Sequence, residues 1–221
     1  MTEQATSLSH SPDTKNRILD AAETLFADKG FDATSLRMIT AAAQVNLAAV
    51  NYHFQSKEAL LHAVYARRAG PVNARRLELL TAHEHSGAPP EVEQVLDALM
   101  RPLFEIGAAR ECIPRLMVRL LYLDAKETSR SVFAAQFQEV FQRFHAAFRR
   151  ALPHLPNEEL LLRMQFVVGA LANTMASTKN LHALSQGQTD TAVTVKALQS
   201  LILFAAAGLR APASEDSACA S

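Results

Sequence analysis

The chain is poor in the residues on which many catalytic and metal-binding sites depend. Its 221 residues include seven glycines, two cysteines and no tryptophan. No G-x-G-x-x-G or Walker-type phosphate loop occurs, and neither the H-E-x-x-H zinc motif nor a G-x-S-x-G nucleophile turn is present. We therefore expect a protein that is not an enzyme and that binds no cofactor.

Cysteine and histidine are also too scattered to predict a metal site. Cys112 and Cys219 are far apart in sequence and form no C-x-x-C pair, which favours reduced thiols. His83 and His85 are the one histidine pair close in sequence, and we expect them to be solvated residues of a loop and not metal ligands. No basic stretch followed by an apolar core begins the chain, and no run of about 18 apolar residues occurs. We expect a cytoplasmic protein without a membrane partner.

Abundant alanine and leucine with little glycine predict an all-α fold. No segment alternates apolar and polar residues as a half-buried strand does. Apolar periodicity, capping residues and prolines predict about nine helices. Their expected ranges are 12–29, 35–43, 47–53, 57–80, 91–108, 114–125, 129–151, 157–182 and 190–209. Polar composition predicts disordered tails at 1–11 and 211–221.

Two short helices on either side of a tight turn predict a helix-turn-helix unit in residues 34–54, TSLRMITAAAQVNLAAVNYHF. Ser35 or Thr34 is expected to cap the first of them, and Asn46 the second. The apolar side chains of Leu36, Ile39, Val45 and Val50 can form a small core. The second helix then directs small, amide and aromatic side chains away from that core, which suits insertion into a DNA major groove.

Residues 15–64 resemble the DNA-binding domain of the TetR family of regulators. The matching features include KNRILDAAETLFADKGF (15–31), VNYHF (50–54) and SKEAL (56–60), at the same relative spacing. The resemblance implies contacts with double-stranded operator DNA. The candidate contacts are Thr34, Ser35, Arg37, Asn46, Leu47, Ala48, Ala49, Asn51, Tyr52, His53 and Lys57. Residues 1–80 carry nine Lys/Arg and eight Asp/Glu, so the resemblance and not net charge supports DNA binding.

The resemblance also implies how the rest of the chain is organised. We expect a three-helix DNA-binding domain at 12–60 and a helical effector-binding and dimerisation domain at 61–210. Helices 157–182 and 190–209 are apolar around much of their circumference and must be covered. In the family such helices pair with their symmetry mates in a homodimer. Burial within a single chain is the alternative.

A phenylalanine stripe in 129–151 is the basis for a predicted apolar effector pocket. The candidate lining is Phe104, Met117, Arg119, Leu120, Phe133, Phe137, Phe141, Phe166 and Met175. Ordinary core packing is the alternative for each phenylalanine. Arg119 requires an anionic partner, which is Asp97, Glu105, Asp124 or a ligand carboxylate.

Residues 31–71 resemble most the PsrA-like branch of the family, which includes members that respond to fatty acids. That resemblance implies a long-chain fatty acid or acyl-CoA as effector. The sequence therefore predicts a ligand-responsive repressor that binds a pseudo-palindromic operator. The alternative is a helical scaffold or protein-interaction module that has lost specific DNA binding.

Overall fold

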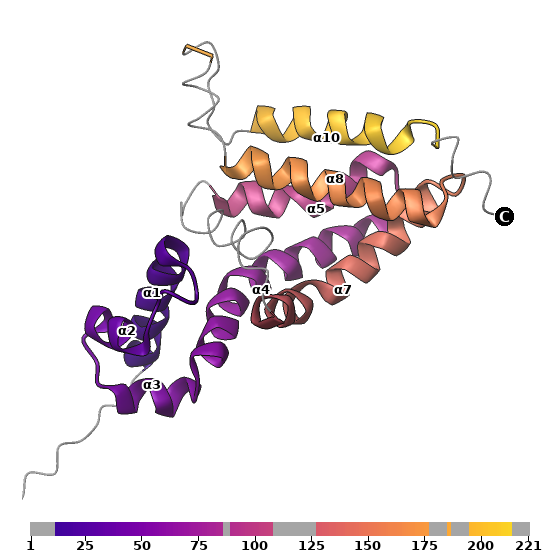
Figure 1. Cartoon of the computed structure of the whole chain (residues 1–221). Helices are drawn as coiled ribbons and strands as arrows, with labels where there is room; N and C mark the ends of the chain where they lie inside the picture. Colours follow the sequence, from indigo (N-terminus) through magenta and orange to yellow (C-terminus); the bar gives the residue numbers. More distant parts are fainter. Residues whose placement is uncertain (1–11, 86–88, 108–126, 177–184, 187–194, 214–221) are drawn as a thin grey trace, which may run out of the picture.

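A computed structural model describes residues 12–85, 89–107, 127–176, 185–186 and 195–213, and every regular element in these ranges is an α-helix (Figure 1). This confirms the all-α prediction. The described helices are α1 (Pro12–Lys29), α2 (Leu36–Ala43), α3 (Leu47–Phe54), α4 (Lys57–Glu84), α5 (Val92–Gly107), α7 (Glu127–Ala151), α8 (Asn157–Ala176) and α10 (Val195–Arg210). The helix predicted at 114–125 lies outside the described residues, as does the predicted tail 1–11.

Local capping chemistry ends α1 and begins α2, α3 and α4 where the sequence predicts, whereas α4 continues to Glu84, four residues beyond its expected end. Gly30 ends α1 with a positive φ of 83°, a conformation that glycine adopts without a steric penalty. The side-chain oxygens of Ser35, Asn46 and Ser56 accept hydrogen bonds from the backbone N–H groups three residues later. Each cap satisfies a donor that the helix itself leaves unpaired.

Helices α1 to α3 and the first half of α4 share one hydrophobic core, which we call the reader core. Ile18, Phe26, Ile39 and Val50 are among its buried members. Leu60, Leu61, Val64 and Tyr65 are its buried members from α4. The predicted boundary between residues 60 and 61 falls inside α4, before the last reader-core residue. We call α1–α3 together with residues 57–65 the reader domain.

A second core, the body core, joins the second half of α4 to α5, α7, α8 and α10 (Figure 1). Leu80 of α4 is fully buried in it, whereas Tyr65 belongs to the reader core. Gly70 and Pro71 lie between these two stretches. Pro71 has no N–H to donate within the helix, and its ring crowds the preceding turn. The point at which α4 passes from one core to the other therefore coincides with a local weakness in its backbone.

Helix α7 also contacts both cores. Val132 is fully buried in the reader core and Phe137 packs against it, whereas Phe144 and Phe148 are buried in the body core. The predicted phenylalanine stripe is thus divided between two cores rather than gathered in one. α4 and α7 together are the described links between reader and body.

A buried arginine joins α4 to the body. Arg76 is 5% exposed, and its Nε donates to the carbonyl oxygen of Leu99 in α5 at 2.7 Å. Its Nη1 donates to Asn73 Oδ1 at 3.0 Å, and Asn73 Nδ2 donates to the carbonyl oxygen of Gln136 in α7 at 2.6 Å. Burial lowers the pKa of Arg76 to about 10, so it stays charged at neutral pH. These bonds connect three helices.

A buried carboxylate joins α1 of the reader domain to the part of α4 that directly follows this domain. Glu23 is 3% exposed. Its Oε2 accepts from Arg67 Nη2 at 2.6 Å and from Arg68 Nε at 2.8 Å. Arg67 also pairs with Asp20, whose side chain is 66% exposed, at 2.8 Å. One arginine thus binds a buried and an exposed carboxylate on the same helix.

Glu23→Ala is expected to lower the free energy of unfolding by about 3 kcal/mol, because it leaves two partly buried guanidinium groups without their shared carboxylate. Asp20→Ala is the matched control and should cost less than about 1 kcal/mol, since exposed ion pairs contribute little. Urea unfolding followed by circular dichroism measures both. Equal losses in the two variants would contradict the importance given to the buried pair.

Candidate nucleic-acid interface

The turn between α2 and α3 occupies residues 44–46 and sets the direction of α3. Gln44 lies in the left-handed region, with φ 53° and ψ 47°. The Gln44 N–H donates to the carbonyl oxygen of Ala41, and that of Val45 donates to Thr40 at 3.0 Å. Asn46 then caps α3 through Ala49 N at 2.9 Å. Every residue of this short connection thus has a backbone or capping bond.

Helix α3 buries one side and exposes the other. Val50 and Phe54 are 1% and 6% exposed in the reader core. Leu47 is 45% exposed and Tyr52 is 65% exposed, and Ala48 and Asn51 are exposed as well. These four residues occupy one face of the helix because they are related by one, four and five positions. We call Leu47, Ala48, Asn51 and Tyr52 the reading face.

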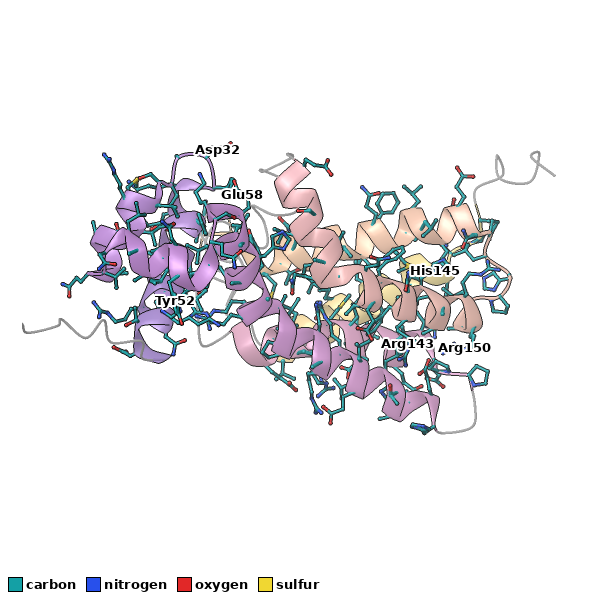
Figure 2. All side chains as sticks on the ribbon, turned by 90° about the horizontal axis from the view of Figure 1, so that it is seen from below. Asp32, Tyr52, Glu58, Arg143, His145 and Arg150 are labelled. Carbon is teal, nitrogen blue, oxygen red and sulfur yellow. The ribbon has the colours of Figure 1, made fainter. Side chains whose placement is uncertain are left out.

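The reading face carries no charged side chain. It offers two apolar groups, one amide and one phenol, and the Tyr52 ring lies edge-on to that of His53 at 5.1 Å between centroids. His53 itself is half-buried. Arg37 is exposed near the start of α2. Figure 2 shows Tyr52 at the opposite end of the molecule from Arg143 and Arg150 of α7. With its apolar, amide and phenol groups, the reading face can form hydrogen bonds and apolar contacts with a partner.

Lys57 and Thr34, both predicted to contact DNA, are turned toward the protein. Lys57 Nζ donates to the carbonyl oxygens of Phe31 at 2.9 Å and Thr34 at 3.0 Å. It also lies 4.1 Å above the centre of the Phe31 ring. Thr34 is fully buried, and its hydroxyl donates to the carbonyl oxygens of Gly30 at 2.7 Å and Leu25 at 3.2 Å. These residues hold the loop that precedes α2.

The predicted DNA contacts therefore divide into two groups. Ser35 and Asn46 use their side-chain oxygens as helix caps, and Thr34 and Lys57 brace the loop before α2. Ala49 is half-buried and packs against the reader core. The residues that the structure brings together on an exposed surface are those of the reading face, with Arg37 on the preceding helix.

Sequence reasoning missed Arg17 of α1. Its Nη2 donates to the carbonyl oxygens of Ala43 at 2.6 Å and Gln44 at 2.9 Å. It closes the C-terminal end of α2, where carbonyl oxygens lack partners within the helix. The contact joins residues 26 and 27 positions apart, and no local signal marks it. Arg17 and Lys57 together fix both ends of α2.

The predicted pocket residues do not come together in the described part of the chain. Met117, Arg119 and Leu120 lie outside it, as does the Phe133 side chain. Phe104 is buried in the body core, Met175 packs against that core, and Phe137 packs against the reader core. Phe141 and Phe166 are 49% and 61% exposed, and Phe141 stacks on His145. The pocket stays a prediction.

A surface pocket of about 390 Å³ lies at the end of the body, lined by Pro89, Glu91, Glu93, Arg150 and Arg210 among others. Arg210 binds Glu93, and this hydrogen bond lowers the pKa of that carboxyl below its usual value. Arg150 is bound to Glu84. Both cations of the pocket are thus neutralised by carboxylates.

Two kinds of site are absent from the residues that the structure describes. No group of three or more His, Cys, Asp or Glu side chains there could hold a metal ion. No described helix is long and apolar enough to cross a membrane.

Lys57→Met is expected to lower the free energy of unfolding by about 2 kcal/mol, because the partly buried carbonyl oxygens of Phe31 and Thr34 lose a charged donor. Arg37→Met removes the same charge from an exposed side chain and should change stability by less than about 0.5 kcal/mol. Thermal unfolding compares the two variants. The account of Lys57 as a brace is refuted if both variants unfold like the native chain.

Two family models match the chain. Residues 18–64 match that of the tetR family of bacterial regulatory proteins, which covers most of the reader domain. Residues 97–208, half of the chain, match the tetracyclin repressor-like C-terminal domain.

Two curated relatives share part of this sequence. It is 44% identical over 48 residues to the probable HTH-type transcriptional regulator YttP of Bacillus subtilis, which is 22% of this chain and 23% of that protein. It is 41% identical over 46 residues to IcaR of Staphylococcus aureus, a negative transcriptional regulator of the biofilm operon icaADBC. That match covers 21% of this chain and 25% of IcaR. The matches thus span about a quarter of each relative.

The fold extends over nearly the whole of a solved regulator. The structure of FadR from Bacillus subtilis in complex with stearoyl-CoA aligns with a TM-score of 0.63 at 16% identity. The alignment covers 87% of this chain and 98% of FadR. At this identity the likeness concerns the fold alone. With the reader domain and the body each matched by its family model, the chain belongs to the tetR family of bacterial regulatory proteins.

Proposed function

We propose that the protein is a ligand-responsive transcriptional repressor that binds a pseudo-palindromic operator as a homodimer. The observation that carries this proposal is the reading face of α3, exposed on a helix whose start is capped and whose opposite side is buried. One such helix reads few base pairs, whereas two related by a two-fold axis read both half-sites of an operator. The negative regulator IcaR among the relatives supports repression.

The surface of α8 and α10 supports the homodimer. The two helices lie side by side in Figure 1 and contact each other. Exposed apolar side chains lie along both helices. They are Leu161, Leu162, Phe166 and Val168 on α8, and Val195, Leu203 and Phe204 on α10. Phe204 and Val195 are each 71% exposed. Clustered exposure of this kind is characteristic of an interaction site, and we propose a second copy of the chain as the occupant.

A buried arginine keeps α8 and α10 in a fixed relation. Arg163 of α8 is 8% exposed and donates to the carbonyl oxygens of Gly208, Leu209 and Ala211 near the end of α10. It also pairs with Glu159 one turn earlier, at 2.9 Å. The guanidinium thus satisfies carbonyl groups that the helix end leaves unpaired. It favours the two helices acting as one surface in the proposed dimer.

The two cores that meet on α4 and α7 provide a route by which an effector can act. A ligand that favours a different arrangement of the body would shift the second half of α4, and with it the reader domain. Weakening DNA affinity 100-fold requires a coupling free energy of about 2.7 kcal/mol. The fold likeness to FadR, solved with stearoyl-CoA, supports a long-chain acyl effector. By linkage, the effector must bind the DNA-free protein tighter by the same factor.

The DNA experiment uses the full chain and duplexes selected from a random library, with binding measured by gel retardation. We expect specific binding that Tyr52→Ala weakens at least thirtyfold, because each of two half-sites loses a contact worth about 1 kcal/mol. Glu58→Gln, an exposed change at the start of α4, is the control. A library that yields no preferred sequence would favour the scaffold alternative.

The same retardation assay tests the effector. Stearoyl-CoA is expected to release the DNA, whereas free coenzyme A is expected to leave it bound. Retention of DNA at saturating stearoyl-CoA would discard the acyl effector and leave the proposed DNA binding in place.

Phe204→Glu is expected to convert the dimer to monomers. In a two-fold dimer each copy would contribute one glutamate to the same apolar interface, so two like charges would be buried there. Leu47→Glu introduces the same charge at an exposed apolar residue of α3 and should leave the dimer intact while abolishing DNA binding. Analytical ultracentrifugation distinguishes the two masses. A Phe204→Glu dimer as tight as the native one would argue against this surface.

A further inference from the structure

The chemistry of the reading face restricts which base pairs α3 can recognise, provided that the proposed DNA binding holds. In the major groove, guanine is read by Arg or Lys, and cytosine by the carboxylates of Asp or Glu. Residues 47–54 contain none of these four residue types. The exposed part of α3 therefore lacks the usual readers of G·C pairs.

The nearest cations do not make up for this. Arg17 is bound to the carbonyl oxygens of Ala43 and Gln44, and Lys57 to those of Phe31 and Thr34. Release of either would remove a charged donor from these carbonyl oxygens, which costs free energy. Among the described residues of the reader domain, the exposed cations Lys15 and Lys29 belong to α1 and Arg37 belongs to α2, so none of them is part of α3.

What the reading face does offer matches an A·T pair. Leu47 and Ala48, in the first turn of α3, present apolar surface, and apolar side chains contact the 5-methyl group of thymine. Asn51 is exposed, and its amide can donate to N7 and accept from N6 of adenine. Leu47 and Asn51 are one helical turn apart, about 6 Å along the axis, which spans about two base-pair steps.

We propose that α3 reads A·T pairs in each half-site, with a thymine methyl group against Leu47 and Ala48 and an adenine edge bonded by Asn51. Recognition then depends on a methyl contact and an amide bond rather than on a guanidinium bound to guanine. Any G·C preference in the half-site is expected to come from outside α3.

The test replaces each thymine of the selected operator, one symmetric pair at a time, by deoxyuridine. This exchange removes the 5-methyl group and leaves every hydrogen-bonding group of the base in place. At the thymines that α3 contacts, we expect about fourfold weaker binding for one half-site and about fifteenfold for both, as the loss of about 0.8 kcal/mol per buried methyl group implies.

A protein–DNA double-mutant cycle assigns the methyl contact to Leu47. In the Leu47→Ala variant, replacing thymine by deoxyuridine should weaken binding by less than about twofold. Ala66→Ser, an exposed change on α4, should leave the loss of affinity the same as in the native chain. Deoxyuridine that leaves affinity unchanged at every thymine, on an operator that the chain does bind, would overturn the inference and keep the proposed function. A selection that yields no operator would overturn both.

Discussion

The ammonium group of Lys57, held between the carbonyl oxygens of Phe31 and Thr34, is the contact on which the DNA-reading end depends. It joins the start of α4 to the loop that leads into α2. Arg17 makes the equivalent contact at the other end of α2, through Ala43 and Gln44. The surface of α3 is neutral because residues 47–54 carry no Asp, Glu, Lys or Arg, and these two neighbouring cations are engaged inside the protein. The same two contacts thus stabilise the reader domain and withhold two cations from DNA.

Beyond the reader domain, the structure is organised by the passage of α4 and α7 between two cores. Each helix buries side chains in both, and the Arg76–Asn73 pair ties α4 to α5 and α7 just after Pro71. A change in the packing of the body therefore has a mechanical path to α3. Glu23, bound to Arg67 and Arg68 before Pro71, keeps α1 attached to the first half of α4. The reader domain would follow that half of the helix as a unit.

Local chemistry made much of this fold predictable from sequence. Ser35, Asn46, Ser56 and Gly30 mark helix ends because capping requires only residues within one turn. The roles of Arg17 and Lys57 escaped prediction because their partners are 23 to 27 positions away in the chain. Periodicity placed Phe141 on the apolar face of α7, but it does not predict how much of a side chain is covered, and Phe141 is 49% exposed. The same limit applies to Phe166, whose helix is apolar on more than one side.

The measurement that tests the account most directly is the dependence of operator affinity on salt concentration. Residues 1–11 contain no Lys or Arg, and in the described part of the reader domain Lys15, Lys29 and Arg37 are the cations not bound to a carbonyl or a carboxylate. Six such cations in a dimer predict a slope of log K against log salt no steeper than about −5. A slope near −10 would require about eleven phosphate-neutralising cations in the dimer, and would contradict an account in which these three cations of each reader domain neutralise the phosphates while Arg17 and Lys57 stay bound within the protein.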